Sequence, residues 1–215
     1  MKEYQYILFD LDGTLTNSFP GITNSVKYAL EKSGYEIPDD NELRKFVGPP
    51  LYYSFTVFCG MSDEEAQQAI KYYRELYTVT GIYESEVYDG IEETLKALKD
   101  AGKDLLVATS KPEHYAGKIV EHFGLMKYFD FVAGASLDKS RAEKEQVIAY
   151  ALDAYGIKDK SKVLMVGDRK HDIEGAKING LDSMGVLFGF GDREELEAAG
   201  AEYIAETAKD ILMIL

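Results

Sequence analysis

The sequence has very little cysteine and no long apolar run. Its single cysteine, Cys59, cannot form an intrachain disulfide bond, which fits a reducing compartment. No apolar segment is long enough to span a bilayer, and the first five residues show no signal-peptide pattern. We therefore expect a cytoplasmic protein that has no membrane partner.

Basic charge is also scarce, because 24 lysines and arginines stand against 38 acidic residues and give a net charge of -14. Proteins that bind nucleic acid or anionic membranes non-specifically need a basic surface, so we expect neither partner here. Long-range electrostatic attraction contributes little to the binding of an anionic substrate by such a protein. Any phosphate site must therefore be local and built from a metal, a lysine and backbone amides. The oligomeric state cannot be read from the sequence.

An alternation of apolar strands and amphipathic helices runs from about residue 87 to the end of the chain. With the apolar run at 6–9, strands are expected at 105–108, 131–133, 163–166 and 184–187, and helices at 91–98, 112–123, 144–155, 173–177 and after Asp192. Repeated strand–helix units favour a parallel sheet that is covered on both faces. The predicted fold class is α/β, with a Rossmann-like parallel sheet core and helices on both faces.

Residues 18–86 lack this alternation and show helical patterns instead. Helices are expected at 22–33, 39–46, 51–58 and 62–80, and Ser62 with Glu65 forms a capping-box start for the last of them. We expect the tyrosines of this segment mainly to pack within a helical bundle. They are Tyr52, Tyr53, Tyr72, Tyr73 and Tyr77. The insert follows the first strand directly, so we predict a Rossmann-like core at 1–17 and 87–215 and an inserted α-helical cap at 18–86.

The segment Asp10-Leu11-Asp12-Gly13-Thr14 is the most informative part of the chain. It follows the first apolar strand, and ligands of open α/β sheets bind at the carboxyl ends of strands. Asp10 is placed to attack an electrophile, Asp12 to handle protons, and Gly13 to allow a sharp turn. The Thr14 hydroxyl is able to donate to an anion. The alternative is a polar loop that caps the next helix, but the whole pattern favours covalent phosphoryl transfer.

Thr109 and Ser110 follow the second apolar strand of the core. Thr109 has two compatible interpretations: an ordinary helix N-cap, or a hydroxyl that binds phosphate together with helix N-terminal amides. Its place at the end of a strand in the same sheet favours phosphate binding.

A second acidic motif, Gly167 to Asp172, follows the strand at 163–166. Asp168 and Asp172 are hard oxygen ligands, and closely spaced carboxylates repel one another unless a cation binds between them. We favour a Mg²⁺ site over a solvated loop of mixed charge. A lysine is needed to offset the negative charge near Asp10, and Lys144, at the start of the helix at 144–155, is preferred to Lys139 and Arg141.

Together these positions resemble the haloacid dehalogenase-like hydrolase superfamily over essentially the whole chain. Segments 46–51, 108–112, 133–138 and 166–172 carry a likeness to the phosphoglycolate phosphatase-like group, closest to its 5'-nucleotidase-like branch. The resemblance implies a Mg²⁺-dependent phosphatase that hydrolyses small phosphomonoesters through an aspartyl-phosphate intermediate. The implied substrate is a small phosphorylated metabolite, either a nucleoside monophosphate or a phosphoglycolate-like compound.

The resemblance also implies a set of roles for the candidate residues. The expected catalytic residues are Asp10, Asp12, Thr109 and Lys144; the expected phosphate-binding residues are Gly13, Thr14, Thr109, Ser110 and Lys144; the expected metal ligands are Asp10, Asp12 through its carbonyl, Asp168 and Asp172. Four alternatives stay open: a phosphoglycolate phosphatase, a phosphosugar mutase, a non-catalytic module in which phosphorylated Asp10 is a signal, and an acidic scaffold that binds metal without catalysis.

Overall fold

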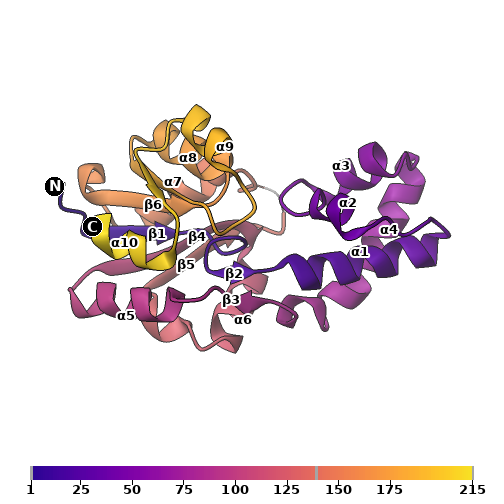
Figure 1. Ribbon diagram of the computed structural model, residues 1–215, viewed down its shortest axis with the longest axis horizontal. Coiled ribbons are helices and arrows are strands. Elements are labelled where there is room, and N and C mark those ends of the chain that lie inside the picture. The colour runs from indigo at the N-terminus through magenta and orange to yellow at the C-terminus, as the bar shows by residue number, and fades with distance from the viewer. Residues whose placement is uncertain (1, 139, 215) are drawn as a thin grey trace. The chain divides into compact units, whose positions relative to one another are not determined.

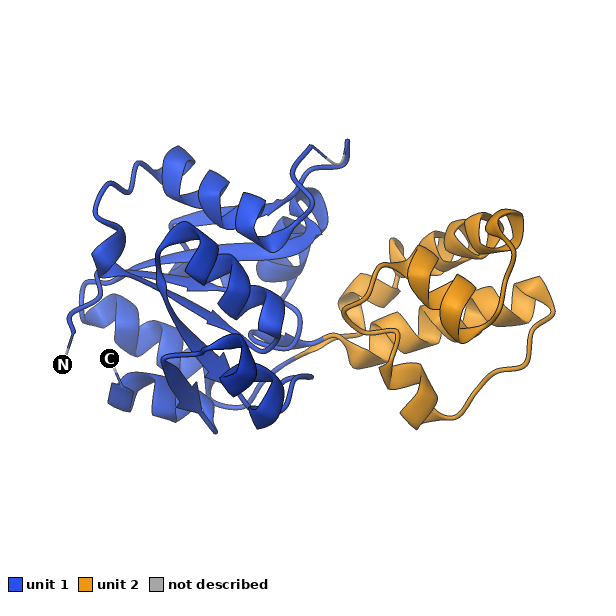
Figure 2. Cartoon of the chain, turned by 90° about the horizontal axis from the view of Figure 1, so that it is seen from above, with its two compact units in different colours: residues 1–17, 87–215 blue, residues 18–86 orange. Residues whose placement is uncertain are grey.

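The computed structural model describes residues 2–138 and 140–214, and the chain divides into two compact units. Unit 1 comprises Met1–Asn17 and Val87–Leu215, and unit 2 comprises Ser18–Glu86 (Figure 2). No helix among the described residues is both long and apolar enough to cross a membrane.

Unit 1 is built on a six-stranded parallel sheet with the strand order β5-β4-β1-β6-β7-β8 (Figure 1). The strands are β1 (Tyr6–Phe9), β4 (Asp104–Pro112), β5 (Phe131–Ala135), β6 (Val163–Gly167), β7 (Asp182–Val186) and β8 (Tyr203–Ala205). Because β4 and β6 flank β1, the carboxyl ends of these three strands lie next to one another at one edge of the sheet.

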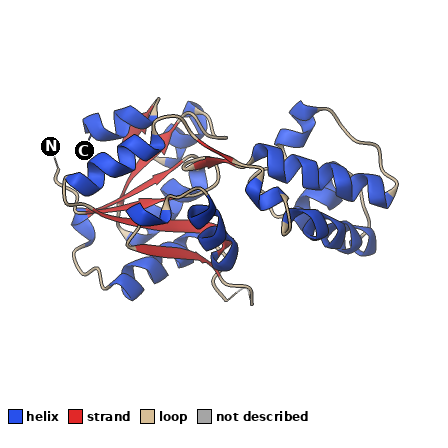
Figure 3. Cartoon of the chain, turned by 90° about the horizontal axis from the view of Figure 1, so that it is seen from below, coloured by secondary structure: helices blue, strands red, loops and turns tan. Residues whose placement is uncertain are grey.

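Helices cover both faces of this sheet, as the expected Rossmann-like core requires (Figure 3). They are α5 (Ile91–Asp100), α6 (Glu113–His122), α7 (Lys144–Tyr155), α8 (Lys170–Asn179), α9 (Arg193–Ala199) and α10 (Ala208–Ile214), with short 3-10 turns at Met126–Tyr128 and Lys160–Lys162. Leu8 of β1 packs with α7 in one hydrophobic cluster, while its neighbours Ile7 and Phe9, which point the opposite way, are also fully buried. Burial on both sides of one strand confirms the predicted fold class.

The structure corrects two expectations for unit 1. The strand predicted at 105–108 continues to Pro112, so α6 begins at Glu113 and Pro112 precedes the helix instead of forming its first turn. Proline fixes its own backbone angle but accepts an extended conformation, which the pairing of Pro112 with Ala135 of β5 provides. The last strand, β8, and the last helix, α10, were not expected.

Unit 2 is helical throughout, apart from its connection to unit 1. Its elements are α1 (Phe19–Ser33), α2 (Asp40–Arg44), α3 (Leu51–Tyr53), the π-helical turn η1 (Ser54–Phe58), α4 (Asp63–Tyr77) and the 3-10 turn η2 (Gly81–Tyr83). The single helix predicted at 51–58 is therefore wrong in its second half. There the wider turn accompanies ring contacts of Phe55 and Phe58 with Phe46, at centroid distances of 5.8 and 5.6 Å.

The helices α2 and α4 of unit 2 begin with side-chain caps, from Asp39 and Ser62. The capping box of Ser62 and Glu65 is present at the start of α4, but that helix ends at Tyr77, before the predicted end at residue 80. Tyr73 and Tyr77 are buried and stacked, as bundle packing predicts, whereas Tyr52 and Tyr53 are exposed. Two short strands, β2 (Thr16–Asn17) and β3 (Glu86–Val87), pair at the connecting segments and were not expected.

Gly21 of α1 allows a close backbone approach within unit 2. A Cβ atom at this position would lie 1.9 Å from the carbonyl oxygen of Gly81. We expect Gly21→Ala to lower the free energy of unfolding by about 1–3 kcal/mol, because overpacking forces the backbone to shift. Gly117→Ala in α6 is the matched control, since nothing lies within 4 Å of its added Cβ. Urea unfolding of both variants tests this, and equal stabilities would contradict it.

Candidate active site

The loop after β1 turns directly at the edge of the sheet. The Asp10 amide donates to the carbonyl of Val166 at 2.9 Å, so Asp10 stays aligned with β6 although β1 has ended. Gly13 has a φ of 86°, a conformation that glycine adopts without strain. A Cβ atom there would lie 2.1 Å from the Asp168 carboxylate. The glycine therefore lets the loop and Asp168 approach each other.

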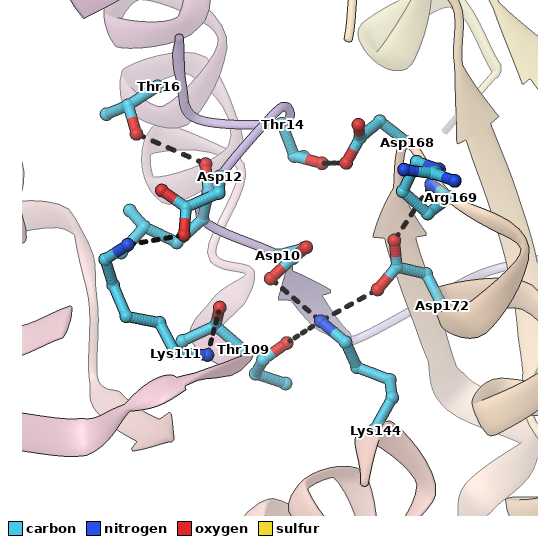
Figure 4. Close-up of polar contacts among 12 residues, drawn as sticks. Asp10, Asp12, Thr14, Thr16, Thr109, Lys111, Lys144, Asp168, Arg169 and Asp172 are labelled. Carbon is cyan, nitrogen blue, oxygen red and sulfur yellow. Dashed lines mark hydrogen bonds and ion pairs between the residues drawn. The ribbon is translucent and has the colours of Figure 1, made fainter. Parts of the chain in front are cut away.

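Lys144 lies at the first residue of α7 and points its ammonium group into this edge (Figure 4). Its Nζ is 2.8 Å from Asp10 Oδ1 and 2.8 Å from Asp172 Oδ1, and it donates to the carbonyl oxygen of Ala108 at 3.0 Å. The ammonium group thus forms two ion pairs and one hydrogen bond in this buried place. Among the candidate basic residues, the structure thus brings Lys144 to Asp10.

The other two candidate cations do not take that place. Arg141 donates to the Gly134 carbonyl at 2.7 Å and pairs with Glu113 at 2.9 Å. Lys139 lies outside the described residues.

Asp168 follows the end of β6 in full burial. Its Oδ1 accepts from the Thr14 hydroxyl at 3.2 Å and its Oδ2 from the Phe190 amide at 2.9 Å. Gly189, beside Phe190, has no room for a side chain, because a Cβ atom would lie 2.3 Å from Asp168 Cβ. The loop after β7 therefore fixes the orientation of this carboxylate.

Asp172 lies in the first turn of α8 and completes an acidic cluster. Its Oδ2 accepts from the Arg169 amide at 3.1 Å. Asp10, Asp168 and Asp172 each offer a carboxylate oxygen, and these oxygens lie within 4.8 Å of one another. We call these three residues the acidic triad.

Burial and mutual repulsion shift the protonation of the acidic triad. Burial raises the pKa of Asp10, although the Lys144 ammonium opposes this, and Asp172 raises it further. Burial raises the pKa of Asp168 well above its ordinary value, and the charges of Asp172 and Asp10 add to the effect. Burial alone would lower the pKa of Lys144, but attraction by Asp10 and Asp172 outweighs it and raises that pKa.

The charges of this cluster fit a divalent cation. When the three carboxylates are ionised, one ammonium group leaves two negative charges uncompensated among them in a buried site. Mg²⁺ prefers oxygen ligands and is held by a few carboxylates, so the donor set has the right chemistry. Asp12 does not contribute its carboxylate to this cluster, because its Oδ2 lies 2.6 Å from Lys111 Nζ.

Thr109 and Ser110 differ in their surroundings. Thr109 is buried in β4, and a hydrogen bond from its side chain lowers the pKa of Asp10. Its N-cap interpretation is wrong, because β4 continues and the capping position of α6 is Pro112. The helix amides expected directly after Thr109 therefore begin only at Glu113. Ser110 is exposed.

Gly13 and Thr14 have contacts within their own loop. The Gly13 amide donates to the Thr16 carbonyl at 2.8 Å, and the Thr14 amide to the Leu11 carbonyl at 3.4 Å. Both residues thus shape the loop, and phosphate binding by them stays a prediction.

Two parts of the site were missed by sequence reasoning. Lys111 lies in the segment 108–112 that carries the family likeness, but nothing in the strand pattern placed it beside Asp12. The loop that orients Asp168 carries the pattern Gly189-Phe190-Gly191, and two glycines around one aromatic residue just past a strand are a usable signal of close backbone approach.

Comparison with known proteins agrees with this geometry. The family model of haloacid dehalogenase-like hydrolases matches residues 7–186. A 5'-nucleotidase of Pseudomonas aeruginosa is 46% identical over 91% of this chain and 88% of its own. The tyrosine-protein kinase PtkA of Mycobacterium tuberculosis is 38% identical over 95% of this chain and 69% of its own.

More distant and structural relatives extend the comparison. A phosphoglycolate phosphatase of Vibrio parahaemolyticus is 28% identical over 100% of this chain and 97% of its own. The crystal structure of a predicted phosphatase from Clostridium acetobutylicum has a TM-score of 0.89 and 49% identity, and covers 98% of this chain and 99% of that one.

The fold and the family match therefore define a hydrolase built on a parallel sheet. The chain belongs to the haloacid dehalogenase-like hydrolase family, and within it to the phosphatases. This confirms the family that the sequence motifs predict.

Mg²⁺ is expected to raise the midpoint of thermal unfolding, because a ligand that binds only the folded state stabilises it. This gain should shrink as the pH falls, since protons compete for Asp10 and Asp168, whose pKa values are raised. A carboxyl with a raised folded-state pKa takes up protons more readily folded than unfolded, so the metal-free protein should gain stability as the pH falls. Calorimetry with Mg²⁺ and with chelator measures both effects.

The control for this prediction removes one carboxylate at a time. Asp168→Asn should lose the Mg²⁺-dependent gain, whereas Asp153→Asn, at an exposed position of α7, should keep it. A gain that is independent of pH, or that survives in Asp168→Asn, would argue against a cation in the acidic triad.

Proposed function

We propose that this protein is a Mg²⁺-dependent phosphomonoesterase that works through a phosphorylated Asp10. One observation carries the proposal: the buried carboxylate of Asp10 is held by Lys144 next to Asp168 and Asp172. A nucleophilic carboxylate, a fixed cation and a cation-binding acidic cluster are the groups that covalent phosphoryl transfer needs.

In the first step of the proposed reaction, Asp10 attacks phosphorus and the bond from phosphorus to the leaving oxygen breaks. The electron pair stays on that oxygen, and Asp12 supplies it with a proton. In the second step a water attacks the phosphorus, the bond to Asp10 breaks, and Asp12 takes up the proton of the water. Dehalogenases release halide and have no leaving alcohol to protonate, so Asp12 favours phosphoesters.

The transferred phosphoryl oxygens need donors that stay in place while charge develops. Lys144 and the Thr109 hydroxyl lie beside Asp10 and are proposed to bind them, with Ser110 and the loop of Gly13 and Thr14 as further candidates. Because Lys144 is held by Asp10 and Asp172 before substrate arrives, it is already oriented for this task.

The carboxylates of Asp10, Asp168 and Asp172 and the carbonyl of Asp12 are proposed to hold Mg²⁺. When bound, the cation supplies positive charge that offsets the charge of the phosphoryl group. We also propose that residues 18–86 act as a cap that excludes water during the reaction.

The favoured substrate is a nucleoside 5'-monophosphate, because the relative at 46% identity is named a 5'-nucleotidase. Phosphoglycolate is the second candidate, supported by the relative at 28% identity with that name. The relative named a tyrosine-protein kinase makes phosphotyrosine a necessary member of any test.

Phosphate release from nucleoside 5'-monophosphates, phosphoglycolate, sugar phosphates and phosphotyrosine, with Mg²⁺ and with chelator, tests the proposal. We expect Mg²⁺-dependent release that is fastest for a nucleoside monophosphate. Asp10→Asn should abolish it because the amide is a poor nucleophile, whereas the matched control Asp153→Asn, at an exposed position of α7, should leave it unchanged.

Several results would redirect the assignment. Preference for phosphoglycolate would select the second substrate. A sugar phosphate that isomerises without releasing phosphate would indicate a mutase, and a long-lived phosphorylated Asp10 without turnover would indicate a signalling module. Full activity of Asp10→Asn would rule out the mechanism.

A further inference from the structure

Lys111 is a nearly buried lysine whose ammonium group contacts Asp12. Its side chain is 7% exposed, and its Nζ lies 2.6 Å from Asp12 Oδ2. Figure 4 shows the Asp12 carboxylate turned toward Lys111 and away from Asp10. The acidic triad does not include Asp12, so the site contains two separate groups of charges.

The end of β4 determines where Lys111 lies. The pairing of β4 with β5 shifts register between Thr109 and Pro112, and Lys111 falls within the irregular part. Its amide donates to the Thr109 hydroxyl at 3.3 Å. Lys111 is therefore tied to the same strand end as the proposed phosphate ligand Thr109, and its side chain has a defined starting point.

The two oxygens of Asp12 have different surroundings. Oδ2 faces the Lys111 ammonium, while Oδ1 is buried and has no hydrogen-bond partner among the described residues. A buried carboxylate oxygen without a donor costs free energy, which a bound ligand with an O–H group would recover. Oδ1 is thus the oxygen left for the proton of a leaving alcohol or of water.

The chemistry of lysine gives the two oxygens of Asp12 different roles in both protonation states. An ammonium group only donates hydrogen bonds, so Oδ2 must act as the acceptor whether Asp12 is ionised or protonated. When Asp12 carries a proton, that proton must lie on Oδ1. Contact with Lys111 therefore selects one oxygen of Asp12 for proton transfer.

We propose that Lys111 is a positioning residue for Asp12: it holds Oδ2 so that Oδ1 carries the proton to and from the reacting oxygen. This rests on the proposed phosphatase function. As the bond from phosphorus to the leaving oxygen breaks, its electron pair stays on that oxygen, and the proton moves to it from Oδ1. Oδ1 then accepts one proton from the attacking water, so Asp12 ends each cycle as it began.

The dependence of the rate on the leaving group distinguishes a lysine that positions Asp12 from one that binds the substrate and from one that only supports the fold. An alkyl phosphate needs a proton on its leaving oxygen, whereas p-nitrophenyl phosphate releases a stable anion that needs none. A lysine that acts through Asp12 affects mainly the alkyl ester. A lysine that binds the substrate affects both, and a lysine that only supports the fold affects both through the amount of folded enzyme.

The test compares kcat/KM of Lys111→Met for the best alkyl phosphate of the panel above and for p-nitrophenyl phosphate, because kcat/KM reports the steps up to phosphorylation of Asp10, whereas the later attack of water is common to both esters. We expect kcat/KM for the alkyl ester to fall roughly tenfold to a hundredfold, as for other misplaced catalytic groups, with kcat/KM for p-nitrophenyl phosphate little affected. Lys111→Arg should recover part of the loss. Lys118→Met, at an exposed position of α6, is the matched control and should behave like the unchanged protein.

A double-variant cycle with Asp12→Asn completes the test. If Lys111 acts through Asp12, Lys111→Met combined with Asp12→Asn should be no slower than Asp12→Asn alone. Equal losses of kcat/KM on both esters, or losses that multiply in the double variant, would overturn the inference and leave the proposed function intact. An unchanged protein that releases no phosphate from either ester would instead overturn the proposed function.

Thermal unfolding identifies variants that lose the fold. Asp12 is 23% exposed, so water is able to solvate its carboxylate when Lys111 is replaced, and we expect thermal unfolding of Lys111→Met close to that of Lys118→Met. A Lys111→Met protein that is folded and equally active on the alkyl ester would also overturn the inference.

Discussion

The Lys144 ammonium, held between Asp10 and Asp172, is the interaction on which the rest of the site depends. Ions buried without partners cost several kcal/mol each, so neither carboxylate nor lysine would be stable here alone. The interaction requires that the end of β1, α7 and α8 bring these groups to one point. Because β1 lies between β4 and β6, the sheet order itself places Asp10, the Ala108 carbonyl and Asp168 at one edge.

Close packing around the carboxylates follows from the same constraint. A Cβ atom on Gly13 or Gly189 would overlap Asp168, and one on Gly167 would lie 2.2 Å from Asp172. Backbone without side chains thus takes the place that solvent would otherwise occupy, and this burial is what raises the pKa of Asp168. A site closed in this way favours a bound cation, because three carboxylates face one ammonium group there.

Much of this arrangement is predictable from the sequence, because parallel strands end at a common edge and apolar strands are easily recognised. The helix Lys144–Tyr155 is found at its predicted bounds, so Lys144 was a sound candidate. The continuation of β4 to Pro112 was not predictable, since it depends on pairing with β5 and a register shift. The π-helical turn Ser54–Phe58 is likewise set by ring contacts with a residue outside its own segment.

The two lysines of the site differ in the charge that they balance, and this suggests why the site has both. Lys144 leaves its group of carboxylates with excess negative charge, which suits a place where a cation and a phosphoryl group must bind. Lys111 and Asp12 form a pair without net charge. A neutral pair next to a charged cluster does not compete for the cation. In the proposed mechanism, the two lysines therefore keep nucleophilic attack on Asp10 and proton transfer on Asp12.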